Sequence, residues 1–329
     1  MLLLNMFIFK YILLTLFISI FAFNYSYANN NDYDNWLLDL KEDALKRGIS
    51  TDTFERAMSD AVIIPKVRTL DKKQPETQIT FKDYYNRTVN KKRINLGKSN
   101  YKRYKNDLFK IAEKYNVQPR FILAIWGIET NYGGYTGSFS VISSLTTLAF
   151  QGRRAKFFRN QLLDAIEIID KKYIELKNMK GSWAGAMGQS QFMPSSYLAY
   201  AQDFDNDGKK DIWSNHLDVF ASIAYYLKSH GWDYNKTWGR EVIVPKTFIK
   251  TLKKTNLNSK SLKFWSDNNI VNINGKKLPY LNYKANLIFP DGYDGKAFLV
   301  YHNFFKIKKY NASTYYALSV ALLSDRIKY

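Results

Sequence analysis

The segment from Phe121 to Ile128 is apolar on nearly every side. A surface helix has one apolar stripe and one polar face, whereas a helix that is apolar all round is buried. Pro119 suits the first turn of such a helix, and the Gly133-Gly134 pair lets the chain turn away after it. The sequence therefore predicts a buried helix that ends just before these glycines.

Glu129 falls near the end of this helix and is the only carboxylate over residues 114–163. A carboxyl packed among Ile125, Trp126 and Ile128 loses hydration, which raises its pKa and keeps it protonated closer to neutral pH. A general acid needs this protonated state, so Glu129 is a candidate catalytic proton donor. The alternative interpretation is a helix-terminal Glu paired with a Lys or Arg, because structural ion pairs also perturb titration.

The chain is long enough for two or three domains with real cores, having 329 residues of which 46% are hydrophobic. It contains no cysteine. Its stability must therefore come from packing, and the lipid that some exported proteins carry on an N-terminal cysteine is excluded.

Residues 1–28 resemble a secretory signal. Lys10 precedes an uncharged apolar run from Tyr11 to Phe23, and Ser26-Tyr27-Ala28 resembles a small-x-small cleavage site. Cleavage near Ala28 would give a periplasmic protein that is not a lipoprotein. An uncleaved membrane anchor is the alternative, because the apolar stretch approaches the length that spans a bilayer.

The net charge of +20 would fall only to +19 on removal of residues 1–28, since Lys10 is their one charged residue. Such an excess favours polyanionic surroundings, which include nucleic acid, anionic lipid head groups and acidic cell-wall polymers. Export argues against nucleic acid and leaves peripheral contact with a membrane open. For any single cluster, such as Lys91-Lys92-Arg93, an ordinary soluble basic surface is the alternative.

Helical patterns dominate the chain, and short alternating runs follow Trp238. Besides the buried helix, we expect helices over 34–60 with a break at Gly48, 84–89, 101–115, 155–176, 195–201 and 313–325. We expect strands over 241–245, 270–273, 285–289 and 297–301. The predicted fold class is α+β, mainly α, with a small sheet late in the chain.

The segment from Gly181 to Tyr197, GSWAGAMGQSQFMPSSY, combines glycines with polar and aromatic side chains. Ser182, Gln189 and Gln191 offer hydrogen bonds, and Trp183 offers a flat face, which together suit a sugar chain. A loop that packs on the core uses similar residues and is the alternative. A Tyr-Asn pair at residues 310–311 precedes the last helix and could reach into a cleft.

The segment DFDNDGKKDIW starts with acids at relative positions 1, 3 and 5 and a glycine at position 6. This matches the first half of an EF-hand calcium loop, which uses Asp203, Asp205 and Asp207 here. Position 12 is Ser214 instead of Glu, and Asp218 could close a longer loop. An acidic turn that caps the following helix is the alternative.

The blocks WGIETNYGGYTG, SLTTLAFQGRRAKFF, GSWAGAMGQSQFMPSSY, DFDNDGKKDIW and NFFKIKKYNASTYYALSVALLSDRI resemble the membrane-bound lytic murein transglycosylase B family, whose members cleave peptidoglycan. The match runs in order from about Asp34 to the C-terminus. It implies a lysozyme-like α core, an accessory helical domain and a small antiparallel β domain. The accessory domain would cover residues 29–104, joined by part of 144–178. The core would cover residues 105–238 and be completed by 303–329. The β domain would cover residues 239–302.

The resemblance also implies roles for single residues. Glu129 takes the position of the sole catalytic acid/base. The saccharide groove corresponds to Ser182, Trp183, Gln191, Tyr226, Tyr310, Asn311 and Tyr316, with Trp183 and Tyr316 matched less closely. The calcium loop corresponds to Asp203, Asp205, Asp207, the Lys209 carbonyl and Asp218.

The activity implied is non-hydrolytic cleavage of the β-1,4 bond between N-acetylmuramic acid (MurNAc) and N-acetylglucosamine (GlcNAc), which leaves 1,6-anhydro-MurNAc ends. One acid stands where glycosidases use two, so Glu129 would act as general acid and then as general base. The reaction needs no cofactor, calcium would be structural, and the partner is a glycan strand bound by a monomer. A hydrolytic muramidase and a non-catalytic peptidoglycan-binding protein are the alternatives.

Overall fold

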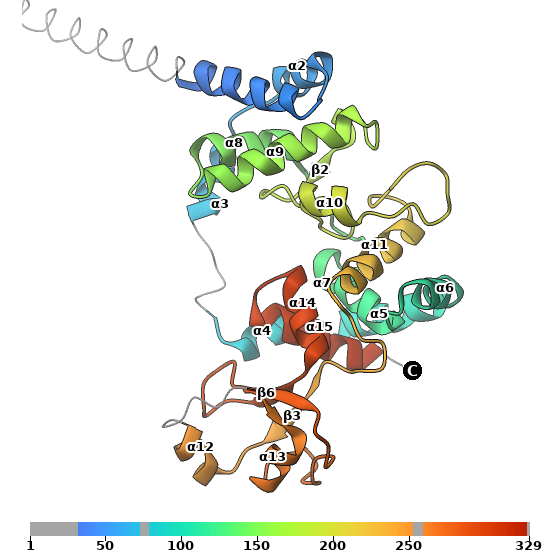
Figure 1. Ribbon diagram of the computed structural model, residues 1–329, viewed down its shortest axis with the longest axis vertical. Coiled ribbons are helices and arrows are strands. Elements are labelled where there is room, and N and C mark those ends of the chain that lie inside the picture. The colour runs from blue at the N-terminus through green and yellow to red at the C-terminus, as the bar shows by residue number, and fades with distance from the viewer. Residues whose placement is uncertain (1–31, 73–78, 253–258, 328–329) are drawn as a thin grey trace, which may run out of the picture.

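The computed structural model describes residues 32–72, 79–252 and 259–327, so the signal-like segment 1–28 lies outside the described residues. The described chain is mainly helical with a small antiparallel sheet, which confirms the predicted fold class. Two groups of helices lie one above the other in Figure 1, and the sheet lies at the lower end. No helix in the described ranges combines the length and apolarity needed to span a bilayer.

The upper group contains a helix over 32–46, α2 (Thr51–Ser59), α3 (Pro65–Lys72), α8 (Val141–Gln151) and α9 (Ala155–Asp170). Gly48 has a φ of +80°, and the Ser50 hydroxyl caps α2 by accepting from the Thr53 N–H at 3.3 Å, so the predicted break is confirmed. α8 packs along α9, and α2 packs on α9. Helices from two distant parts of the chain therefore form this group.

The central group contains α4 (Phe81–Thr88), α5 (Lys91–Arg103), α6 (Lys105–Tyr115), α7 (Pro119–Thr130), α11 (His216–Ser229), α14 (His302–Tyr310) and α15 (Thr314–Ile327). α10 (Pro194–Tyr200) lies between the two groups and packs on α9 and on α11 (Figure 1). α7 is the predicted buried helix, and Phe121 to Ile125 have no exposed surface. α5, α6, α11 and α15 pack around it. After α7 the chain turns through Asn131, Tyr132 and Gly133, all with φ between +51° and +79°.

Two predicted helices differ from the observed helices by more than one turn at an end. The pattern over 101–115 belongs to the end of α5 and to α6, because Tyr104 leaves helical geometry and its ring stacks on His216. The helix predicted over 155–176 ends at Asp170, since Lys172 takes a left-handed φ of +59°. Tyr173, Ile174 and Leu176 lie beyond that point and still pack against the core, which explains why the apolar pattern extends past the helix. They do so from a turn and from a short 3-10 helix over Leu176–Asn178.

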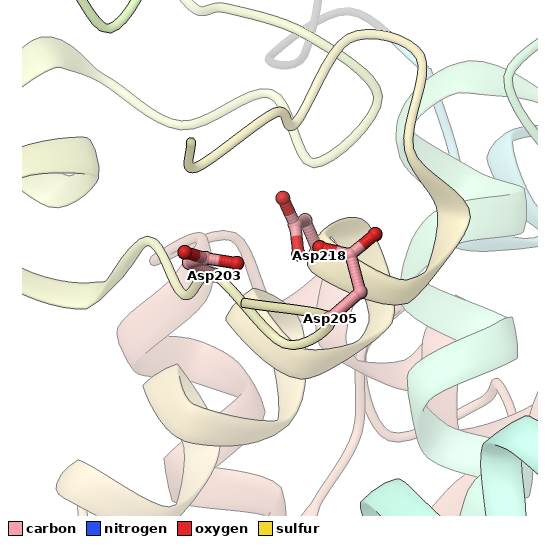
Figure 2. Close-up of side chains that lie close together, drawn as sticks. All are labelled: Asp203, Asp205 and Asp218. Atoms are coloured by element: carbon pink, nitrogen blue, oxygen red, sulfur yellow. The ribbon is translucent and has the colours of Figure 1, made fainter. Parts of the chain in front are cut away.

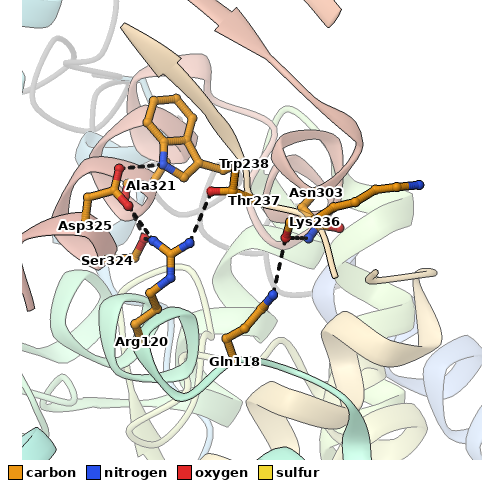
Figure 3. A network of polar contacts seen from close by, with 9 residues as sticks. All are labelled: Gln118, Arg120, Lys236, Thr237, Trp238, Asn303, Ala321, Ser324 and Asp325. Carbon is orange, nitrogen blue, oxygen red and sulfur yellow. Dashed lines mark hydrogen bonds and ion pairs between the residues drawn. The ribbon is translucent and has the colours of Figure 1, made fainter. Parts of the chain in front are cut away.

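The N-terminal end of α7 is tied to α15 and to the segment that precedes the sheet (Figure 3). Arg120 pairs with Asp325 of α15 and donates to the Thr237 hydroxyl at 3.1 Å. Asp325 also accepts from the Trp238 indole N–H at 2.9 Å. Gln118 and Asn303 both donate to the Lys236 carbonyl. These contacts fix where the buried helix begins.

Over the described residues, the sheet has five strands in the order β4-β6-β7-β3-β5, and every neighbouring pair is antiparallel. Its elements are β3 (Gly239–Ile243), α12 (Lys246–Leu252), β4 (Lys260–Ser261), α13 (Leu262–Asp267), β5 (Val271–Asn272), β6 (Lys284–Ile288) and β7 (Ala297–Val300). In β7, Phe298 and Val300 join the main core while Ala297 and Leu299 join a second core around Trp265. All four predicted strands are therefore present, and β7 lies between two cores.

The predicted domain boundaries stay predictions, and the packing bears on two of them. α4 and α5 precede the boundary at residue 104, yet α5 packs on α7 and α15, and α4 packs on α15. Asp291 of the sheet region accepts from the Phe81 N–H at 2.6 Å and from the Lys82 N–H at 3.1 Å. The first turn of α4 is thus joined to the sheet region.

Candidate active site

Glu129 lies in the last turn of α7, and its carboxyl faces α15. The Tyr316 hydroxyl donates a hydrogen bond to Glu129 Oε1 at 2.6 Å, although 187 residues separate the two in the sequence. Tyr316 is 3% exposed, whereas Glu129 is half-buried and keeps some surface. The acid is therefore held by a buried donor and remains open on one side.

Burial raises the pKa of Glu129 to about 7, and the hydrogen bond from Tyr316 opposes that rise. Protein atoms surround the carboxyl closely enough to remove most of its hydration, even though part of the residue touches solvent. Within the described residues, no carboxylate or cation contributes to the shift. No ion pair in the described part of the chain includes Glu129, so the alternative of a Glu paired with a Lys or Arg is not supported.

Burial raises the pKa of Tyr310, and the charges of Glu129 and Tyr226 add to this rise, so Tyr310 lies close to the Glu129–Tyr316 pair. Its hydroxyl donates to the Ser190 carbonyl at 2.6 Å. The rings of Tyr226 and Tyr310 lie 4.8 Å apart, and the Tyr226 hydroxyl donates to the Lys309 carbonyl at 2.6 Å. The structure therefore gathers three predicted groove residues from α11, α14 and α15 near Glu129.

Gln191 has a left-handed φ of +50°, and its amide donates to the carbonyls of Thr136 at 3.0 Å and Gly188 at 2.9 Å. Gln191 thus ties the loop before α10 to the turn after α7. It directly follows Ser190, whose carbonyl accepts from Tyr310. This places Gln191 beside Tyr310, which lies near Tyr226 and Glu129.

Gln189, whose side chain was predicted to offer hydrogen bonds to a sugar, is 6% exposed. Its side chain accepts from the Trp126 indole at 2.8 Å and donates to the Trp213 carbonyl at 2.8 Å. Its carbonyl accepts from the Thr130 hydroxyl at 3.0 Å. Gln189 therefore holds α7 against the loop, which agrees with the alternative of a loop packed on the core.

Ser182 and Trp183 start a tight turn after β2 (Lys180–Gly181), which pairs with β1 (Phe139–Ser140). The Ser182 hydroxyl accepts from the Ala186 N–H at 3.0 Å. Ser182 and Trp183 are both half-buried. Asn311 lies between α14 and α15, where its side chain accepts from the Ser313 N–H at 2.9 Å. These three residues keep partly accessible side chains.

Asp203, Asp205 and Asp218 converge, and each offers a carboxylate oxygen within 4.8 Å of the others (Figure 2). Asp218 is fully buried and accepts from the N–H groups of Phe204 at 2.7 Å and Asp211 at 2.8 Å. Burial is the main reason why the pKa of Asp218 rises to about 6, and the charges of Asp205 and Asp203 add to this rise. The predicted closure of the acidic loop by Asp218 thus has geometric support.

The remaining predicted ligands are Asp207 and the Lys209 carbonyl. Asp207 is outside this convergent group among the described residues, and its Oδ1 accepts from the Lys209 N–H at 2.8 Å. Gly208 takes a φ of +84°, as the sharp turn of such a loop requires. Three convergent oxygen donors with crowded negative charge suit a hard divalent cation.

Tyr84 of α4 was not singled out in the sequence, yet it interacts electrostatically with Tyr316 and with Arg93 of α5. Arg93 in turn donates from Nε to the Asn131 side chain at 3.3 Å, just past the end of α7. The two helices that carry Tyr84 and Arg93 lie outside the glycine-rich blocks with the recognisable motifs. Nothing in their local sequence distinguishes them from other residues of a basic helix.

The helical core and the acid at the end of its buried helix define a lysozyme-like protein. Residues 32–325 match the family model described as the transglycosylase SLT domain, so the chain belongs to that family. It is 32% identical over 197 residues to membrane-bound lytic murein transglycosylase B of Escherichia coli K12. That alignment covers 57% of this chain and 54% of the relative, so the chain spans about half the length of the curated relative it matches.

Solved structures of similar proteins agree with the family. SltB3 of Pseudomonas aeruginosa, in complex with NAG-anhNAM-pentapeptide, is 39% identical with a TM-score of 0.85, and the match covers 90% of this chain and 79% of that one. Lytic transglycosylase Slt35 of Escherichia coli, in complex with calcium, is 27% identical with a TM-score of 0.74, and the match covers 88% of this chain and 92% of that one. The resemblance seen in the sequence motifs is confirmed.

Proposed function

We propose that this protein is a peptidoglycan lytic transglycosylase that cleaves the MurNAc-GlcNAc β-1,4 bond without water. The observation that carries the proposal is the carboxyl of Glu129, which is the only carboxylate over residues 114–163 and whose pKa is raised by burial to about 7. The family match over residues 32–325 supports the same activity. A hydrolase of the usual kind needs a second acid to activate water or to act as nucleophile.

Glu129 meets two opposite demands in this reaction. Protonated Glu129 donates its proton to the bridging oxygen, and the bond from that oxygen to carbon 1 of MurNAc breaks. The N-acetyl group or dipoles of the groove stabilise the oxocarbenium-like charge. Ionised Glu129 then takes the proton of the carbon-6 hydroxyl as that oxygen attacks carbon 1, which closes the 1,6-anhydro ring and restores the acid.

Tyr316 supports both steps. Burial favours neutral Glu129, while the hydrogen bond from Tyr316 favours the ionised form, so the two forms lie close in free energy near pH 7. We infer that Tyr316 also lines the saccharide groove, together with Ser182, Trp183, Gln191, Tyr226, Tyr310 and Asn311. A crystal structure with a bound muropeptide tests these contacts.

Glu129→Gln tests the chemistry directly, because the amide has nearly the same shape but cannot donate or accept the catalytic proton. We expect lysis of sacculi to fall by at least about a thousandfold while the variant still sediments with sacculi. Mass spectrometry of the products of the parent enzyme should find 1,6-anhydro-MurNAc ends.

Reducing MurNAc ends from the parent enzyme would instead identify a hydrolytic muramidase. Lysis that survives Glu129→Gln would reject Glu129 as the catalytic residue. A parent protein that binds sacculi but releases no fragments would be a non-catalytic peptidoglycan-binding protein.

We further propose a structural calcium ion bound by Asp203, Asp205, Asp207, the Lys209 carbonyl and Asp218. The convergence of three of these carboxylates supports the site, as does the calcium complex of Slt35. The ion would offset the repulsion among the acids and fix the loop before α11. It takes no part in the proton transfers.

We infer export to the periplasm, with cleavage near Ala28 and no lipid anchor, from residues that lie outside the described ranges. The partner of the enzyme is the peptidoglycan glycan strand, with a monomer as the working form and peripheral membrane contact through the basic surface. Cell fractionation and N-terminal sequencing of the protein test the location and the cleavage together, since an uncleaved anchor would leave Met1 in the membrane fraction.

A further inference from the structure

The turn after Glu129 holds three consecutive residues in the left-handed region of backbone conformation. Asn131 has a φ of +51°, Tyr132 of +61° and Gly133 of +79°. Glycine and asparagine tolerate this region, whereas an aromatic residue is strained there. Strain of this kind persists only where the surrounding structure holds the residue in place. The contacts of Tyr132 must therefore hold it in this conformation.

The ring of Tyr132 fills a space between α5 and α7 that two glycines leave open. A Cβ atom added to Gly97 of α5 would lie 2.3 Å from the Tyr132 hydroxyl, and one added to Gly127 of α7 would lie 2.6 Å from Cζ of the same ring. The ring also meets Trp126 edge to face, with centroids 5.4 Å apart, and its hydroxyl donates to the Arg93 carbonyl at 3.1 Å. Two helices therefore hold this side chain at once.

The turn transmits this restraint to Glu129, because only two residues separate Glu129 from Tyr132. The Tyr132 N–H donates to the Trp126 carbonyl in α7 at 3.3 Å. The Thr130 hydroxyl accepts from the Gly133 N–H at 3.0 Å. The last turn of α7 and the residues after it are thus joined by hydrogen bonds, and a shift of the ring would move the Glu129 carboxyl as well.

Tyr132 is 8% exposed, so its ring belongs to the core. Glu129 has to reach the bridging oxygen of a glycan strand while it keeps the hydrogen bond from Tyr316. We propose that Tyr132 is a positioning residue, which fixes the last turn of α7 so that the Glu129 carboxyl meets the oxygen of the bond that breaks. This inference rests on the proposed function, because it assumes that Glu129 transfers the proton.

Tyr132→Leu removes the ring and leaves the strained turn without its main contacts. The substrate is purified glycan strands, and circular dichroism gives the folded fraction of each variant. We expect kcat per folded molecule to fall about a hundredfold, while KM changes by less than about twofold. The matched control Tyr301→Leu removes a buried tyrosine from the second core and should keep kcat per folded molecule at the parent value.

A second set of variants keeps an aromatic ring at position 132. Gly97→Ala adds a Cβ atom that would lie 2.3 Å from the Tyr132 hydroxyl, so the ring must shift, and kcat should fall about tenfold. Tyr132→Phe removes the hydroxyl and should by itself leave kcat within about threefold of the parent. In the double variant, Tyr132→Phe should bring kcat of Gly97→Ala back to within about threefold of the Tyr132→Phe value.

Three results would overturn the proposal. If Tyr132→Leu loses no more kcat per folded molecule than Tyr301→Leu, Tyr132 contributes to stability alone. If KM rises while kcat stays at the parent value, Tyr132 acts in binding of the strand. A loss in Gly97→Ala that Tyr132→Phe does not relieve would show that the hydroxyl contact is not responsible. Failure of the proposed function itself is distinguishable, because the parent would then release no anhydro ends.

Discussion

At the scale of the residue, Glu129 is subject to two opposed influences. Removal of water from its carboxyl favours the neutral acid, and the Tyr316 hydroxyl at 2.6 Å favours the carboxylate. Burial is the larger influence, so the pKa rises to about 7 instead of falling. An acid that must first donate and then accept a proton is most effective when its pKa lies near the working pH.

Tyr316→Phe removes the hydrogen bond that favours ionised Glu129, so the pKa of Glu129 should rise further above its ordinary value. Parent activity requires the protonated acid and should decline as pH rises through about 7. In the variant this decline should move to higher pH, and the maximal rate should fall about tenfold because the carboxylate formed after donation loses its stabilising partner. The pH profile of kcat/KM is the measurement. A decline that stays in place or moves to lower pH would contradict this assignment.

At the scale of the element, the acidic loop over residues 203–218 positions the start of α11. Asp218 in the first turn of α11 accepts from two backbone N–H groups of the loop, at 2.7 Å and 2.8 Å. The same carboxylate lies within 4.8 Å of two other acids. The loop is therefore shaped by hydrogen bonds but destabilised by charge, which is the arrangement that a bound divalent cation would stabilise.

Saturating calcium should raise the melting temperature of the protein, by an amount that corresponds to about 2.7 kcal/mol at a hundredfold excess over Kd. Asp205→Asn removes one exposed ligand and should abolish most of this increase, whereas the exposed Asp267→Asn outside the loop should keep it. Calcium binding should weaken as pH falls through about 6, because protonation of Asp218 then competes with the cation. Calorimetry with calcium or chelator measures these effects. Equal melting temperatures in both solutions would remove the calcium site.

At the scale of the whole molecule, the candidate active site depends on where α7 and α15 meet, because one helix carries Glu129 and the other carries Tyr316. The pairing of Arg120 with Asp325 joins these two helices at their far ends, and Thr237 and Trp238 add the segment that leads into the sheet (Figure 3). Side chains of Arg120 and Asp325 are 16% and 33% exposed. Removal of one partner from a partly buried pair costs far more than removal of one partner from a surface pair, because the remaining charge has already lost part of its hydration.

Arg120→Ala should lower the free energy of unfolding by about 3 kcal/mol, because a partly buried ion pair with Asp325 and the hydrogen bond to the Thr237 hydroxyl are both lost. Arg56→Ala breaks the exposed pair with Asp52 and should cost less than about 0.5 kcal/mol. Urea unfolding of the two variants compares the effects. Similar losses in both would mean that the network does not hold the two helices together.

The sequence alone determined the local structure around Glu129. α7 could be predicted because a segment that is apolar on every side is stable only inside a protein, and the strands could be predicted because their alternation differs from helical spacing. The same burial identified Glu129 as a candidate acid. The division of residues 101–115 between two helices could not be predicted, because Tyr104 leaves the helix to stack on His216, a contact across more than a hundred residues.

Only the tertiary structure decided what surrounds the acid. Tyr316 reaches Glu129 from 187 residues away, and Tyr84 and Arg93 reach the same region from helices that carry no recognisable motif. The family resemblance named Tyr316 but could not give its contact with the carboxyl. Periodicity records which face of an element is buried, whereas the partner of a buried polar group depends on how elements pack, and that information is distributed over the whole chain.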